Sequence, residues 1–266
     1  MIATLRRWVA GLAVALLGAC STLVATPPGT PVNAADANAA WARVLQRFVD
    51  AQGEVDFSAL ASDRTDLDLF VRFVAQQPLQ GIAAPDARLA HMINAYNALS
   101  MFNVIDSGIP ATHAGLNKLK FFVLRQFTIG GEPLSLVAFE NDVIRPFARQ
   151  RGDPRVHFAL NCSALSCPVL PRTPFSAAAI DAELEREARA FFARPQNFRI
   201  DAATRTVWLS EILNFYTEDF VPASSTTPAP SLIAYANRFA AQPAPVDYAV
   251  QFTPYDWTVA NRRRVR

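Results

Sequence analysis

Cysteine and histidine are scarce in this chain of 266 residues, which has three of each. A structural zinc site usually takes four ligands, mostly cysteines and histidines. A metal site is therefore the least favoured interpretation of the few cysteines and histidines in this chain. The sequence also has no glycine-rich phosphate loop and no internal repeat, which argues against a nucleotide-binding motif and a repeat architecture. We therefore expect no metal and no cofactor.

An excess of charge of one sign is also lacking, with 25 Lys and Arg against 23 Asp and Glu. Without Arg6 and Arg7, which fall in the N-terminal segment, the count is 23 to 23. A balanced chain offers no general attraction to a phosphate backbone, so no nucleic-acid partner is expected. The tail at 262–266, RRRVR, is strongly basic, and we interpret it as a solvated terminus.

Residues 1–19 resemble an export signal, because Arg6 and Arg7 precede an apolar run too short to span a membrane stably. The run ends in LGAC, which is similar to a bacterial lipobox, where cleavage leaves a lipidated cysteine as the new N-terminus. An ordinary secretory signal is the alternative. We expect an exported lipoprotein, anchored through Cys20 on the periplasmic side of a membrane, and Ser21 after it suits the outer membrane.

Composition divides the rest of the chain into a tether and one domain. Residues 20–40 are small, polar and proline-bearing, without an apolar period that could bury a face, so we expect a flexible tether. Residues 41–261 have the size of one domain, and 51% of the chain is hydrophobic, enough for a sizeable core. Helical periods and hairpin signals alternate in this region. This pattern predicts an α+β fold, with helices packed on a small antiparallel sheet.

One predicted helix, over 89–105, is apolar on nearly every side, which is typical of a helix in the centre of a domain. Its exceptions, Asn94, Asn97 and Ser100, are three residues apart and form a polar seam. Buried amides need hydrogen-bond partners, so the seam is either a structural network or the wall of a site, and the network is the commoner case.

Hairpins are predicted around Gly130–Gly131 and through 198–209, because alternating β-rich runs flank turn residues there. Residues 155–161, RVHFALN, are also predicted to be a strand, with His157 and Asn161 on the same face. The cysteine loop, residues 162–167, follows that strand directly.

Cys162 and Cys167 remain once Cys20 is assigned to the lipid, and two uses of them stay open. One of them could be a thiolate nucleophile activated by His157, which would both lower the thiol pKa and carry protons. The pair could instead close a small disulfide loop, which an oxidising compartment permits. A permanent disulfide would exclude the nucleophile.

Further polar residues could complete a site around His157. Glu140 or Asn161 could orient the imidazole ring, although Glu140 could equally form an ordinary ion pair with Arg145. Two clusters of aromatic and acidic residues could line a cleft or join the C-terminal part to the core; they contain Tyr216, Glu218 and Asp219, and Tyr255, Asp256 and Trp257.

Six motifs in order resemble the DUF547 family, whose members include exported bacterial proteins and plant proteins. The resemblance runs from about Trp41 to Trp257, and the motifs are GEVDFSAL, INAYNAL, LSLVAFENDVIRP, DPRVHFALNCSALSCPVL, LSEILNFYTEDF and YDW. It implies a fold similar to papain-like or transglutaminase-like enzymes, although both cysteines here follow the histidine. The positions that the family pattern implies are Asn94, Tyr96, Asn97, Glu140, His157, Cys162, Cys167 and Pro168.

Two functions follow from the motifs together. In the first, Cys167 or Cys162 attacks an amide or ester carbonyl, His157 moves the proton, and Asn94 or Asn97 donates to the oxyanion. In the second, the protein is a binding module with a Cys162–Cys167 disulfide. A peptide or another cell-envelope molecule would be the ligand in either case, with Tyr96, Tyr216, Asp219 and Asp256 as further binding residues.

Overall fold

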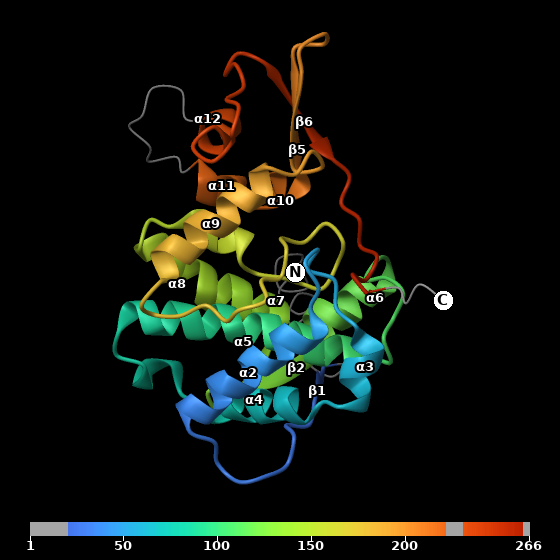
Figure 1. The fold of residues 1–266 in the computed structure, drawn as a ribbon, viewed down its shortest axis with the longest axis vertical. Coiled ribbons are helices and arrows are strands. Elements are labelled where there is room, and N and C mark those ends of the chain that lie inside the picture. Colours follow the sequence, from blue (N-terminus) through green and yellow to red (C-terminus); the bar gives the residue numbers. More distant parts are fainter. Residues whose placement is uncertain (1–20, 222–230, 263–266) are drawn as a thin grey trace, which may run out of the picture.

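The computed structural model describes residues 21–221 and 231–262 (Figure 1). The predicted signal at 1–19, the predicted lipidation site Cys20 and most of the basic tail lie outside these residues. Within them, no helix is long and apolar enough to span a membrane.

Helices make up most of the regular structure. The longer helices are α2 (Ala34–Phe48), α4 (Thr65–Gln76), α5 (Pro85–Asp106) and α9 (Ile180–Phe192). The short α-helices are α3 (Phe57–Ser62), α6 (Leu116–Leu119), α7 (Leu136–Ala138), α8 (Arg145–Gln150), α10 (Glu211–Phe215), α11 (Thr217–Phe220) and α12 (Leu232–Ala236). Two segments are π-helical, η2 (Lys120–Leu124) and η3 (Phe139–Ile144), and two are 3₁₀-helical, η1 (Leu79–Gly81) and η4 (Pro154–Phe158).

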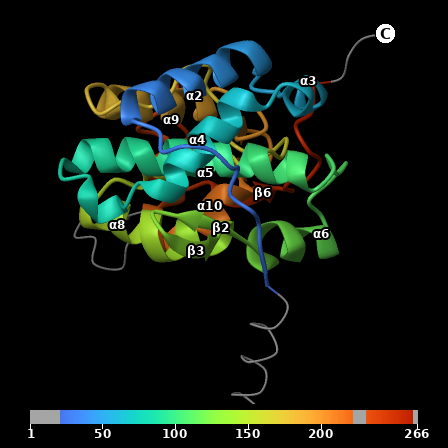
Figure 2. The ribbon, with the colours of Figure 1, turned by 90° about the horizontal axis from the view of Figure 1, so that it is seen from below.

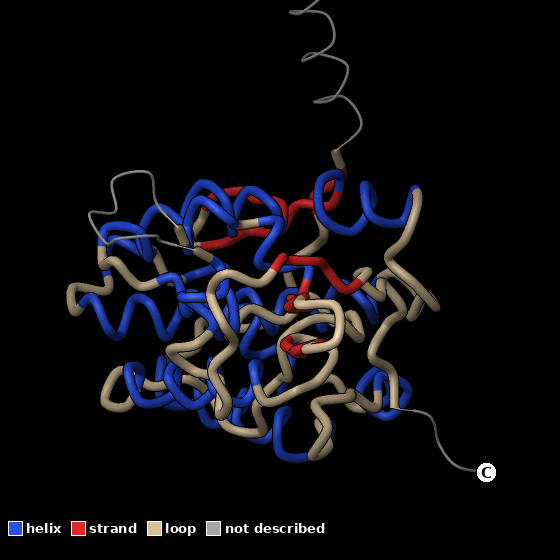
Figure 3. Tube along the Cα trace, turned by 90° about the horizontal axis from the view of Figure 1, so that it is seen from above, coloured by secondary structure: helices blue, strands red, loops and turns tan. Residues whose placement is uncertain are grey.

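The strands are short, and loops cover much of the surface when the fold is seen from above (Figure 3). They are β1 (Thr22–Leu23), β2 (Arg125–Ile129), β3 (Glu132–Ser135), β4 (Phe198–Asp201), β5 (Thr206–Ser210) and β6 (Ala249–Thr253). The α+β class that the sequence predicted is therefore confirmed.

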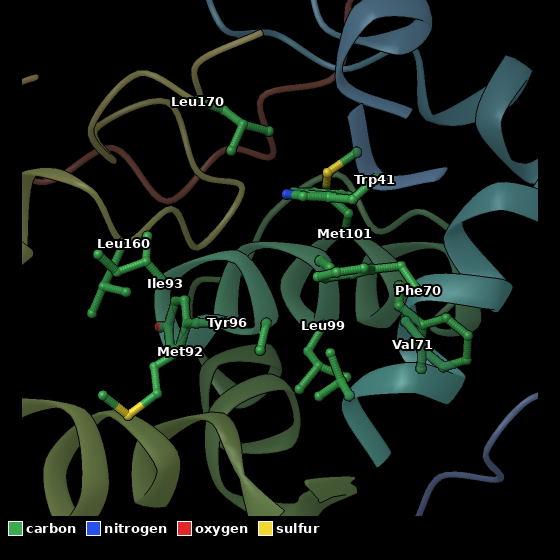
Figure 4. Close-up of a cluster of buried hydrophobic side chains, with 14 of the residues drawn as sticks. Trp41, Phe70, Val71, Met92, Ile93, Tyr96, Leu99, Met101, Leu160 and Leu170 are labelled. Carbon is green, nitrogen blue, oxygen red and sulfur yellow. The ribbon is translucent and has the colours of Figure 1, made fainter. Parts of the chain in front are cut away.

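Helix α5 forms the middle of the fold. Every side chain from Leu89 to Val104 is buried, as the apolar sequence of this helix predicted. Figure 2 shows α5 between α2 and α4 on one side and β2, β3, α6 and α8 on the other. Trp41 of α2 and Phe70 of α4 stack at 5.3 Å between ring centroids, and both lie beside α5 in the core (Figure 4). Elements on all sides thus hold the helix that carries the polar seam.

Each of the two sheets joins a predicted hairpin to a parallel strand from elsewhere in the chain. β2 and β3 pair antiparallel through Gly130 and Gly131, both at positive φ, and β1 lies parallel to β2. β4 and β5 pair antiparallel, and β6 lies parallel to β5. The prediction of one antiparallel sheet is corrected to two small mixed sheets. A parallel partner distant in sequence leaves no local turn signal, which is why it was not predicted.

The segment 155–161 is not a strand, contrary to the prediction. Asp153 accepts a hydrogen bond from the backbone N–H of Arg155 and caps η4, which begins at Pro154. Proline is well suited to the first position of a helix, and this start signal outweighs the alternation of a few residues. His157 and Asn161 consequently have different surroundings.

The tether predicted over 20–40 is partly ordered structure. Thr22 and Leu23 pair with β2, Val24 is buried, and α2 begins at Ala34 with Asn33 as its N-cap. Alanines on the buried face of α2 are too weakly apolar to produce a clear period in the sequence. The folded part therefore starts about twenty residues earlier than the predicted boundary at 41.

Candidate functional site

A cavity of about 520 Å³ lies where the α5 helix, the cysteine loop and the C-terminal segment come together. Its walls are largely apolar and aromatic. The apolar lining includes Leu119, Phe122, Val123, Leu160, Phe215 and Trp257, and the polar lining consists of Tyr96, Lys118, Glu140, His157, Tyr216 and Tyr255, with the sulfurs of Cys162 and Cys167. The structure thus brings most of the predicted site residues to one cavity.

Both π-helical segments contribute to these walls. Glu140 lies in η3, within a continuous helical run from α7 to α8, and Phe122 and Val123 lie in η2. A π-helical turn widens the helix and changes the direction of its side chains, and such turns are frequent at functional sites. Ser135 caps the start of this run by accepting a hydrogen bond from the N–H of Ala138.

Glu140 is buried, with 8% of its surface exposed, and it lies near two tyrosine hydroxyls. The Tyr96 hydroxyl donates to Oε2 of Glu140 at 2.9 Å, and Tyr216 lies near the same carboxylate. Burial, followed by the charge of Glu140, raises the pKa of both tyrosines well above their usual value. Both hydroxyls therefore stay protonated and remain donors at neutral pH.

His157 is held by a carboxylate, but the carboxylate is Asp219 rather than Glu140 or Asn161. Its Nε2 lies 2.7 Å from Oδ2 of Asp219, and its ring stacks on Tyr216 with 4.1 Å between centroids. The prediction that Glu140 or Asn161 orients His157 is corrected accordingly. α11 begins directly after α10 and brings Asp219 back towards η4, a tertiary relationship that no local pattern encodes.

Asp219 also binds two arginines of α8. Nε of Arg145 lies 2.8 Å from Oδ2, and Arg149 pairs with Oδ1. Burial favours the neutral acid, but hydrogen bonds from His157, Arg145 and Arg149 outweigh it and hold the pKa of Asp219 well below its usual value. Because the carboxylate is ionised, Nε2 of His157 carries the proton of their shared hydrogen bond.

Cys162 and Cys167 form a disulfide, so neither is a free thiol in this structure. The sulfurs lie beside Tyr255, whose hydroxyl is 3.4 Å from Sγ of Cys162 and 3.1 Å from Sγ of Cys167. Burial raises the pKa of Tyr255 above its usual value, and the nearby charge of Glu140 adds to this effect. Of the two uses of the cysteines that the sequence left open, the disulfide is the one present.

Asn97 and Asn161 support the cysteine loop and do not line the cavity. Nδ2 of Asn97 donates to the carbonyl of Ala159 at 3.0 Å, and its Oδ1 accepts from the N–H of Asn161 at 2.7 Å. Nδ2 of Asn161 donates to the carbonyl of Pro168 at 2.6 Å. The oxyanion-donor role predicted for Asn97 is not available in this arrangement, because Asn97 does not line the cavity.

Asn94 and Asp256 also have structural partners outside the cavity. Nδ2 of Asn94 donates to the carbonyl of Phe175 at 2.8 Å, and its Oδ1 accepts from the indole of Trp41 at 3.1 Å. Asp256 caps a turn through the N–H of Thr258 and lies in a neighbouring hollow with Asn161. The helix seam is thus the hydrogen-bonded network that its sequence favoured.

Sequence reasoning did not identify Lys118, Leu119, Phe122 and Phe215 as site residues. They lie in an apolar segment around η2 and at the end of α10, where their types alone indicate a core. Their unusual exposure is the signal, since Phe215 exposes 44% of its surface and Leu119 43% beside the cavity. Exposure is not readable from one sequence.

The fold and site define an α+β domain with an aromatic cavity walled by a disulfide. Residues 80–192 match the family model described as "Protein of unknown function, DUF547", which confirms the resemblance over that region. The matched region contains Tyr96, Glu140, His157 and the cysteine loop, whereas α10 and the segment 255–257 lie beyond it. No curated protein and no solved structure matches the chain. The papain-like fold stays a prediction.

Proposed function

We propose that the protein is an exported, lipid-anchored protein of the cell envelope that binds a small molecule or a peptide side chain in its cavity. The lipobox-like LGAC supports the anchor, and it predicts that the mature chain starts at a lipidated Cys20 on the periplasmic side of the outer membrane. In cells fed an alkyne-bearing fatty acid, the wild-type chain should be labelled and a Cys20→Ala variant should not.

The observation that carries the binding function is the chemistry of the cavity. Pockets that hold small organic molecules have volumes of roughly 300–1,000 Å³, apolar walls and a few convergent polar groups. The present cavity has about 520 Å³, with aromatic walls and the Glu140, Tyr96 and His157 side chains in its lining. The disulfide contributes by fixing the loop that forms one wall.

A second function, thiol-dependent hydrolysis or acyl transfer, is supported by one observation. Cys162, Cys167 and His157 all line the same cavity, so reduction of the disulfide would place two thiols and an imidazole beside a bound ligand. This candidate needs a dithiol reductant, and it predicts rapid alkylation of one thiol in the reduced native protein below pH 8. Slow alkylation of both thiols, at the rate of an unfolded control, would exclude it.

Calorimetric titration of the full chain in detergent micelles tests the binding function. The probes are 2-phenylethylamine, 2-phenylethanol and phenylacetate, which share a ring and differ in the charge of the head group. We expect saturable binding of at least one probe, and its loss in Leu160→Trp, since the larger ring would fill the cavity. Failure of all three to bind the wild-type protein would refute the proposal.

A further inference from the structure

We propose that the cavity is specific for an organic ammonium group, with the Glu140 carboxylate as its counter-ion. This inference rests on the ligand-binding function proposed above and adds the chemical class of the ligand. It starts from a carboxylate that the fold buries without a cation.

Glu140 makes no ion pair with any residue of the described chain. Glu183, 9% exposed, has none either, but it accepts hydrogen bonds from the N–H and the hydroxyl of Ser176 and does not line the cavity. Two other buried carboxylates do pair with arginine. Glu187, 7% exposed, pairs with Arg186, and Asp219 pairs with two arginines. An ionised carboxylate offers about four acceptor positions, and the hydroxyl of Tyr96 occupies one of them. A buried charge is costly unless it is paired, so a cationic ligand would supply the counter-charge that Glu140 lacks.

The cations near the cavity are already engaged elsewhere. Arg145 lies over the ring of Tyr216, but its guanidinium binds Asp219, Asn141 and Glu218. Nζ of Lys118, in the cavity lining, lies 4.1 Å from the ring centroid of Trp257 rather than on Glu140. The partner for Glu140 is therefore expected from outside the chain.

The aromatic wall provides the rest of an ammonium-binding surface. Trp257 lies between Tyr255 and Phe122, with ring centroids 4.3 Å and 5.9 Å away, and Phe215 lies 5.7 Å from Tyr255. Aromatic faces attract cations through their quadrupole. Lys118 demonstrates this on the wall itself, since its ammonium group already lies over Trp257 and 5.7 Å from the centroid of Phe215.

The class of ligand follows from these two surfaces. A primary ammonium group has donors for the unused acceptor positions of Glu140, and an apolar body would contact the aromatic and aliphatic walls. A neutral alcohol would fill the same space without the charge, and a carboxylate would be repelled by Glu140. Binding should therefore follow the order amine, alcohol, acid.

The test compares the wild-type full chain with Glu140→Gln, which keeps the shape of the side chain and removes its charge. The matched control is Glu187→Gln, because Glu187 is a buried carboxylate that does not line the cavity. Isothermal titration gives the affinity for 2-phenylethylamine, 2-phenylethanol and phenylacetate at pH 7. Thermal unfolding of each variant shows that the fold is retained.

We expect the wild-type protein to bind the amine at least about tenfold more tightly than the alcohol, the scale of one charge-assisted hydrogen bond. Glu140→Gln should remove this preference and keep the binding of the alcohol, and Glu187→Gln should change neither. Equal affinity for amine and alcohol in the wild-type protein, or a preference that survives Glu140→Gln, would overturn the ammonium inference while the binding function stands. No binding of any probe would overturn both.

Discussion

His157 and Asp219 form a hydrogen-bonded pair in which Nε2 and Oδ2 are 2.7 Å apart and the side chains are 2% and 3% exposed. Arg145 binds the same oxygen of this carboxylate, and Arg149 binds the other oxygen. With Nε2 directed at Asp219 and its ring stacked on Tyr216, the imidazole has one fixed orientation at the cavity wall. The pair therefore joins α11 to η4 and to α8 as well as positioning His157.

Replacing Asp219 by Asn should destabilise the protein by about 3 kcal/mol at pH 7, because it leaves the guanidinium of Arg145, whose side chain is 12% exposed, without its buried counter-charge. Differential scanning calorimetry of the wild-type protein and the variant measures this. Asp181→Asn is the control, since Asp181 pairs with Arg155 but is 87% exposed, and it should change stability by less than about 1 kcal/mol.

The same variant has a defined pH dependence. The folded pKa of Asp219 is depressed, so its stabilisation is present above the unfolded pKa of about 3.9 and is lost as the pH falls towards the folded value. The difference between wild type and Asp219→Asn should thus shrink below pH 4. A difference that stays constant from pH 7 to pH 2 would show that the charge of Asp219 does not stabilise the fold.

The double variant Cys162→Ser/Cys167→Ser should lose about 2 kcal/mol of unfolding free energy, the value expected for a short closed loop. Urea unfolding with and without reductant measures it: reductant should lower the stability of the wild-type protein and leave the variant unchanged. Mass spectrometry shows whether the reductant has opened the disulfide. If the bond is open and the stability of the wild-type protein is unchanged, the predicted contribution of the disulfide is wrong.

Local patterns predicted the parts of this fold that local physics determines. The α5 helix follows from its apolar sequence, and the turn at Gly130–Gly131 follows from two glycines that adopt positive φ. The pairing of β6 with β5 joins residues some forty positions apart, so it depends on tertiary contacts. The alternation of 155–161 was instead overruled by a local signal, the helix start at Pro154.

The candidate site divides in the same way. The chemistry-bearing residue types at 140, 157, 162 and 167 were recognisable by their motifs, and the cavity does unite them. Their partners were not recognisable: Asp219 is 62 residues from His157, and Tyr96 is 44 residues from Glu140. Sequence spacing cannot show which of several carboxylates pairs with a given histidine, because each pairing depends on how distant helices pack.

Buried His91 should make stability fall as the medium becomes acidic. Its Nε2 has no hydrogen-bond partner in the described structure, its ring lies against Phe73, and burial lowers its pKa to about 4. His91 takes up a proton near pH 6.5 in the unfolded chain and only near pH 4 in the folded protein. The free energy of unfolding is therefore unaffected by His91 above pH 6.5, and it falls as the pH drops from 6.5 to 4.

His91→Leu should remove that part of the decline, on the order of 2–3 kcal/mol between pH 7 and pH 4. Urea denaturation at several pH values measures it, with the window above pH 4 chosen because Asp219 titrates below it. His113 is a second buried histidine with a pKa lowered to about 4 by burial, so the variant should keep a residual decline. An unchanged pH profile in His91→Leu would mean that His91 is protonated equally in both states.

Trp257→Ala should weaken the binding of 2-phenylethylamine about tenfold, because it removes the ring that contacts Tyr255, Phe122 and Lys118 at the cavity. Trp208→Ala is the matched control, since Trp208 lies on β5 against Arg199 and does not line the cavity. Calorimetric titration should give wild-type affinity for the control. An equal loss in both variants would attribute the effect to general destabilisation, whereas loss in Trp257→Ala alone would place the ligand against the aromatic wall of the cavity that Glu140 also lines.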